Sequence, residues 1–105
     1  MEQPITNASL MHPPGRGEIV LQREGLRVVH LVLNAGSELP DTTAVDDVVF
    51  LVTRGKGVIY DMQEPRHVEA CDVIDVGTGE TYSIEAIDEL EMTIVHATLV
   101  QPAPH

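Results

Sequence analysis

Histidines are the side chains of this sequence best suited to chemistry. Of the five, His30 and His96 lie in apolar stretches and His67 lies just before another, whereas His12 and His105 are near the two ends. Imidazole is a good ligand for Zn, Fe and Ni, so His30, His67 and His96 would form a site for a divalent transition metal if they converged. The stretches around His30 and His96 are apolar at odd and even positions alike, so the pattern does not decide which way these rings point. The alternative is that each is a core or interface histidine with one hydrogen-bond partner.

The single cysteine and the two central arginines are weaker candidates. Cys71 has acidic residues at 69, 72 and 75, and acidic neighbours weaken a thiol as a nucleophile. We therefore expect Cys71 to be a buried structural thiol. Arg27 and Arg54 are the only basic residues of the central strands, and we expect them to pair with some of the 17 acidic residues.

Short apolar stretches punctuated by Gly and Pro must position these side chains. Stretches rich in β-branched residues and too short for helices are typical of strands, and no amphipathic helical pattern of useful length occurs. The stretches before and after Gly55 are expected to form a hairpin, and the polar residues 61–67 a loop or turn. The expected strands are residues 18–22, 26–34, 48–52, 58–60, 68–76, 81–86 and 91–100. Strands at this spacing predict an all-β sandwich or barrel.

Length and charge limit the classes of function. One hundred and five residues are enough for one domain and too few for two. We expect an N-terminal arm at residues 1–17, rich in Pro and Gly, and a single barrel domain at residues 18–105. A formal charge of −11 disfavours nucleic acid and anionic membrane as partners. The N-terminal sequence has neither the basic start nor the apolar stretch of a signal peptide, so we expect a cytoplasmic protein.

Two segments resemble the two sequence motifs of the cupins. In the first motif, a glycine is followed after five residues by His-x-His, then by Glu and finally by Gly; residues 36–55, GSELPDTTAVDDVVFLVTRG, keep both glycines. The second motif, built on Gly, Pro-x-Gly, His and Asn, resembles residues 71–86, CDVIDVGTGETYSIEA, in which Cys71 takes the place of the first glycine. The resemblance covers about residues 26–100. It implies an all-β, cupin-type double-stranded β-helix, or jelly-roll barrel.

The positions of the cupin metal ligands are substituted in this chain. The resemblance places Thr42, Ala44 and Val48 where the first motif has its ligands, and Tyr82 where the second has its histidine. A hydroxyl, a methyl and an isopropyl group do not supply a ligand set for a transition metal. We therefore expect no metal cofactor at these positions. A divalent transition metal bound elsewhere remains the alternative.

The resemblance also implies which side chains line the barrel. This predicted lining is Thr42, Ala44, Val48, Phe50 and Val52, facing Tyr82 and Ile84. It is apolar with two hydroxyl groups, which suits a small neutral or apolar ligand. Tyr82 would donate a hydrogen bond to that ligand or act as a general acid, and the second role needs a base such as His30 or His96. In the alternative interpretation, Tyr82 only fills space.

Three functions remain open. The leading hypothesis is a metal-free cupin barrel that binds a small molecule or acts as a regulatory homodimer. The alternatives are a cupin enzyme of the dioxygenase or isomerase type and a structural module with a filled barrel. A homodimer is expected because strands that are apolar on both faces leave hydrophobic surface for a partner to cover.

Overall fold

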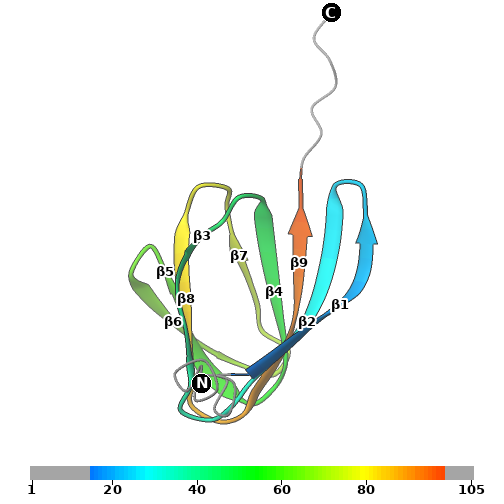
Figure 1. The fold of residues 1–105 in the computed structure, drawn as a ribbon. Coiled ribbons are helices and arrows are strands. Elements are labelled where there is room, and N and C mark those ends of the chain that lie inside the picture. The colour runs from blue at the N-terminus through cyan, green and yellow to red at the C-terminus, as the bar shows by residue number, and fades with distance from the viewer. Residues whose placement is uncertain (1–14, 99–105) are drawn as a thin grey trace, which may run out of the picture.

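The protein is an antiparallel β-barrel made of two facing sheets (Figure 1). The computed structural model describes residues 15–98, in which there is no helix and therefore no helix able to cross a membrane. One sheet has five strands in the order β1-β2-β9-β4-β7, and the other has four in the order β3-β8-β5-β6. The strands are β1 (Gly15–Arg23), β2 (Leu26–Leu33), β3 (Glu38–Thr43), β4 (Asp47–Arg54), β5 (Lys56–Asp61), β6 (Glu64–Glu69), β7 (Val73–Val76), β8 (Thr81–Ala86) and β9 (Leu90–Ala97). The all-β fold class is confirmed.

The core lies between the sheets and is built by alternation along the strands. In β8, Tyr82, Ile84 and Ala86 are buried, while the residues between them are only half-buried. The same period of two buries alternate residues of β4 and β9, so each of these strands sends one set of side chains inward. Branched aliphatic side chains dominate the resulting core, as the low aromatic content of the sequence requires.

The barrel has two ends of different character. Four connections lie at one end, between β1 and β2, β3 and β4, β5 and β6, and β7 and β8, and there the two sheets stand farthest apart (Figure 1). We call this the open end. Strands β2, β4 and β8 begin at this end, and strands β5 and β9 finish at it. The inward-facing side chains at these strand ends therefore lie nearest to the open end.

The expected hairpin around Gly55 is wrong. β4 pairs with β7 and β9, whereas β5 pairs with β6 and β8, so the chain leaves one sheet at Gly55 and enters the other. Gly55 has φ +88°, a left-handed conformation that glycine adopts without strain. The sequence predicts the turn correctly. It does not predict the pairing, because a glycine turn between two apolar stretches is typical both of a hairpin and of a crossing between sheets.

The loop or turn expected at residues 61–67 is a turn of only two residues between two strands. β5 continues to Asp61, the two-residue turn Met62–Gln63 follows, and β6 begins at Glu64. Both turn residues have positive φ, at +52° and +72°, which is usual for Asn-Gly but uncommon for these types. Pro65 fits because β6 is an edge strand, where a missing N–H costs no ladder bond.

Cys71 lies in a turn and is exposed, so its expected burial is wrong. It has φ +79° in a turn closed by a 3.0 Å hydrogen bond from the Asp72 amide to the Glu69 carbonyl. This turn divides the strand expected at residues 68–76 into the end of β6 and β7. Cys71 occupies the first glycine position of the second cupin motif. Its positive φ explains why that position prefers glycine, which adopts this conformation most readily.

The expected arm overlaps the first strand. Residues 15–17 pair with the last residues of β2, in the register Gly15 to Leu33 through Gly17 to Leu31. The other residues of the expected arm, 1–14, lie outside the described residues, as do His105 and the last two residues of the expected final strand.

Candidate functional site

Most of the predicted barrel lining is packed core. Thr42 is exposed and donates its hydroxyl hydrogen bond to the Pro40 carbonyl at 3.0 Å. The other six residues are at most 6% exposed and belong to one hydrophobic cluster: Ala44, Val48, Phe50, Val52, Tyr82 and Ile84. These side chains pack against one another in the core. Their direct role in ligand binding therefore stays a prediction.

Tyr82 points into the barrel at the open end. Its ring packs edge-on against Phe50, with ring centroids 5.2 Å apart and planes at 67°. Burial raises the pKa of the Tyr82 hydroxyl above its ordinary value, and the nearby Arg27 guanidinium opposes that shift. The hydroxyl is therefore protonated at neutral pH. It has no hydrogen-bond partner among the described residues and is available as a donor.

Arg27 and His96 lie beside each other on the inner face at the same end. They are cross-strand partners on β2 and β9, and Val48 of β4 is the partner of His96 on its other side. His96 continues the inward series of β9, and Arg27 lies two residues before Val29, which packs on the core. These two side chains and Tyr82 give the open end three polar groups from three strands.

Arg27 has an unused donor. Its Nε atom is buried without a hydrogen-bond partner, and no carboxylate lies within ion-pair range of it in the described part of the chain. The expected pairing of Arg27 with an acidic residue is therefore not met within residues 15–98, nor is that of Arg54. A buried, unsatisfied donor costs free energy, and the described residues supply no acceptor for this one.

His96 is held in its neutral form. Burial lowers its pKa, the Arg27 guanidinium lowers it further, and Asp46 opposes both effects. One ring nitrogen is then a donor and the other an acceptor at neutral pH. His96 and Arg27 share a cavity of about 240 Å³ at the open end, which Gln22, Arg23, Gly25, Leu26, Val45, Asp46 and Thr98 also line.

Asp61 completes the polar groups near the open end. It is the cross-strand partner of Tyr82, and its Oδ1 atom is buried without a partner. Burial raises the pKa of Asp61, with Glu80 adding to the shift, while Arg66, whose Nη2 atom is 3.8 Å from Oδ2, lowers it. The unpartnered oxygen of Asp61 therefore adds an acceptor to the donors at this end of the barrel.

The structure does not bring the three candidate histidines together. His30 is on the outer face of its sheet, with Nε2 2.7 Å from Glu91 Oε2, and His67 is exposed on β6. Two histidines, His30 and His96, are the candidates for a base that serves Tyr82. Of these, only His96 is on the inner face of the barrel, as Tyr82 is. No group of three His, Cys, Asp or Glu residues able to hold a metal occurs within residues 15–98. At the positions that the cupin resemblance assigns to metal ligands, Ala44 and Val48 have no side-chain donor atoms, and the absence of a metal there stays a prediction.

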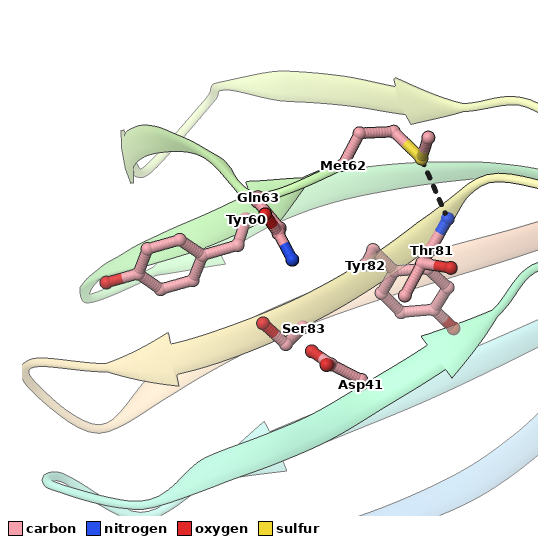
Figure 2. Close-up of a pocket in the computed structure, with 7 residues that line it drawn as sticks. All are labelled: Asp41, Tyr60, Met62, Gln63, Thr81, Tyr82 and Ser83. Atoms are coloured by element: carbon pink, nitrogen blue, oxygen red, sulfur yellow. Dashed lines mark hydrogen bonds between the residues drawn. The ribbon is translucent and has the colours of Figure 1, made fainter.

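A larger cavity lies on the outer face of the four-stranded sheet, and no feature of the sequence indicated it. We call it the outer groove; its volume is about 550 Å³. It is lined by Asp41, Tyr60, Met62, Gln63, Thr81, Tyr82 and Ser83. Figure 2 shows the side chains of Tyr60, Ser83 and Asp41 on the near side of the sheet and the Tyr82 ring behind the β8 ribbon. The groove is therefore separate from the interior of the barrel.

Known structures resemble this chain over most of its length. A cupin superfamily protein from Desulfitobacterium hafniense matches with a TM-score of 0.77 and 17% identity, over 94% of each chain. The cupin domain of Cnp3 from Schizosaccharomyces pombe matches with a TM-score of 0.77 and 20% identity, over 84% of this chain and 67% of that one. A predicted oxalate decarboxylase from Thermotoga maritima matches with a TM-score of 0.74 and 24% identity, over 81% of each chain.

These similarities define the fold and leave the activity open. The similar structures include some named as enzymes and others named only for their fold. No protein-family model matches the sequence, and no curated protein matches it. The two-sheet architecture, the strand order and these structural matches together identify the chain as a protein with the small cupin fold.

Proposed function

We propose that the open end of the barrel binds a small organic acid with one carboxylate and an apolar body, without a metal, and that the protein works as a homodimer. The observation that carries the ligand proposal is the buried, unpartnered Nε of Arg27. The sequence alone favours a neutral or apolar ligand. Arg27 changes that expectation, because a guanidinium next to two neutral donors matches a carboxylate.

The charges around Arg27 support a ligand with a single negative charge. Tyr82 and neutral His96 each offer one hydrogen bond without adding charge. Asp46 lies in the same cavity, and its Oδ1 accepts a 2.7 Å hydrogen bond from the Thr98 hydroxyl. Two cations, Arg23 and Arg27, line the cavity with this one carboxylate, which suits a single negative charge, and the formal charge of −11 of the whole chain leaves little attraction for a multiply charged anion.

The ligand's apolar part would lie toward the core. Val48, the cross-strand partner of His96, is buried, and Phe50 continues the same inward row. A cavity of about 240 Å³ limits the ligand to the size of a small aromatic or branched aliphatic acid. We include no metal in the proposal because the residues at the cupin ligand positions have no suitable donor set.

Benzoate is a suitable probe of this site. We expect it to raise the melting temperature by roughly 5 °C at ten times its dissociation constant. Benzamide, which is neutral, should bind more weakly. Arg27→Met should remove the shift, and Tyr82→Phe should weaken binding about fivefold while leaving stability nearly unchanged. Differential scanning fluorimetry measures the melting temperatures, and calorimetry then measures the dissociation constants.

Arg54→Met is the matched control. Arg54 is exposed at the other end of β4, and its substitution by Met removes the same positive charge. If Arg54→Met weakens benzoate binding as much as Arg27→Met does, the effect comes from net charge and the proposed site is wrong. Elemental analysis of protein purified without chelators tests the metal separately. One transition metal per chain would contradict the metal-free part of the proposal.

The dimer is proposed from the outer face of the five-stranded sheet. Leu51 and Val73 are cross-strand partners there and are 40% and 59% exposed. A neighbouring row of this face is also apolar: Leu21, Val28, Val95 and Val49 lie side by side across four strands. Such a surface on a small barrel needs a partner to cover it.

A second copy of the chain is the occupant that the charges favour. Two chains of formal charge −11 repel each other. However, besides the inward-facing Arg27, three of the six basic residues lie in strands of the five-stranded sheet: Arg16, Arg23 and Arg54. Two copies that meet through this sheet therefore bring their least acidic parts together, in a self-complementary two-fold contact.

Leu51→Glu is expected to raise the dimer dissociation constant at least about tenfold, because it places a charge in the centre of the apolar contact. Sedimentation equilibrium of the wild type and the variant gives both constants. Ile87→Glu is the control, since Ile87 is 53% exposed but lies in the turn after β8 rather than on this sheet. A wild-type protein that is a monomer at all concentrations tested would overturn the dimer.

A further inference from the structure

The outer groove has the composition of a site for a cation. Its one charged lining residue is Asp41, and the rest are two tyrosines, two hydroxyl residues, an amide and a methionine. The Asp41 carboxylate makes no hydrogen bond or ion pair within the described residues. It is therefore free to receive a ligand.

The register of the sheet explains the shape of the groove. Tyr60 of β5 and Ser83 of β8 are cross-strand partners. On the other side of β8, the register with β3 shifts between Leu39 and Thr42, and Asp41 projects from this shift toward Ser83 (Figure 2). Ser83 is small and lies between two larger side chains, so it leaves a depression with Tyr60 on one side and Asp41 on the other.

The turn between β5 and β6 closes the groove toward the open end. Met62 and Gln63 both have positive φ, and the Thr81 amide donates to the Met62 sulfur at 3.3 Å (Figure 2). That contact holds the thioether over the start of β8. Non-glycine residues with positive φ cost free energy and often occur at binding sites. Here they supply a thioether and an amide to the groove, which the usual Asn-Gly turn would not do.

The surroundings of Tyr60 are acidic. Its hydroxyl donates to Glu85 Oε1 at 3.2 Å, and this bond, with the charges of Glu85 and Glu38, raises the pKa of the Tyr60 hydroxyl. Of the basic residues in this sheet, Arg66 pairs with Asp61, and Lys56 lies at the far end of β5 from Tyr60. No basic side chain lines the groove, so its field attracts cations.

We propose that the outer groove binds a primary alkylammonium group. The ammonium donates to the Asp41 carboxylate and the Ser83 hydroxyl, and the adjoining methylene groups lie against the Tyr60 ring and the Met62 thioether. Asp41 supplies the charge, and Tyr60 adds a cation–π contribution. The chemistry is the same whether the group belongs to a free amine or to a lysine side chain of a partner.

Titration of ¹⁵N-labelled protein with n-butylammonium, followed by amide NMR, tests this site. We expect saturable shifts confined to residues of the outer groove, including Thr81 and Ser83. Pentanoate and 1-pentanol have similar chains without the positive charge and should leave these signals unchanged. Nα-acetyl-lysine N-methylamide separates the two sources: tighter binding than n-butylammonium indicates a lysine side chain, and weaker binding a free amine.

Asp41→Asn is expected to weaken n-butylammonium binding about fivefold, and Tyr60→Ala should also weaken it. Asp88→Asn is the matched control, since Asp88 is an exposed acid in the turn between β8 and β9, at the other end of the barrel. The spectrum of each variant away from the groove shows that it is folded. Equal binding by the Asp41→Asn protein and the wild type, or equal shifts with pentanoate, would overturn the proposal.

Discussion

Gly55→Ala is expected to lower the free energy of unfolding by roughly 3 kcal/mol or more. Gly55 has φ +88°, and a Cβ atom there would lie only 2.1 Å from the Glu89 carbonyl oxygen and 3.0 Å from its carbon. Both obstacles are backbone atoms, which do not move aside as a side chain does. The chain must pass this point to change sheets, so relief of the clash would disturb the contact between β4, β5 and the turn before β9.

Gly36→Ala separates the two causes of that loss. Gly36 has nearly the same conformation, φ +81°, but nothing lies within 4 Å of the place where its Cβ would be. Its substitution should therefore cost only about 1 kcal/mol, the strain of the left-handed backbone. Urea denaturation of both variants gives the comparison. Equal losses would mean that strain alone, rather than the clash with Glu89, explains why the first motif ends in glycine.

The fold was largely predictable because its signals are local. Alternation in β8 and the β-branched residues of β2 and β4 specify strands without knowledge of their partners, and the structure has those strands. β3 and β6 were not predicted, because each contains a proline and polar residues that are typical of loops. Both are edge strands, where such residues are tolerated. Edge position is a property of the whole sheet, so the local sequence could not supply it.

The candidate site was less predictable, since it depends on which face each side chain occupies. The sequence predicts that Arg27 pairs with an acidic residue, although it precedes Val29, Leu31 and Leu33 at the period of two that marks the inward face. That period was the available signal, but apolar residues at the intervening positions concealed it. The outer groove depends on the register shift in β3 and on the Met62–Gln63 turn. Neither has a recognisable signature in a single sequence.

Phe50→Ala is expected to lower the free energy of unfolding by about 3–5 kcal/mol. Phe50 is fully buried, and it is the one large aromatic side chain that packs on Tyr82. Its removal leaves a cavity in the centre of β4, between the two sheets. A domain of this size is stable by only about 5–15 kcal/mol, so the variant would be marginally folded at best.

This measurement also separates a packed core from an open binding pocket. If Phe50 mainly lined space for a ligand, its truncation would enlarge that space at a smaller cost and would alter benzoate binding instead. Phe50→Leu keeps most of the volume and should lose less than half as much stability, which keeps the test readable if the alanine variant does not fold. Val45→Ala, at a side chain 78% exposed, should change stability by no more than about 0.5 kcal/mol. A loss below about 1.5 kcal/mol for Phe50→Ala would mean that the centre of this barrel is hollow, and the ligand would then be expected to lie deeper than Arg27.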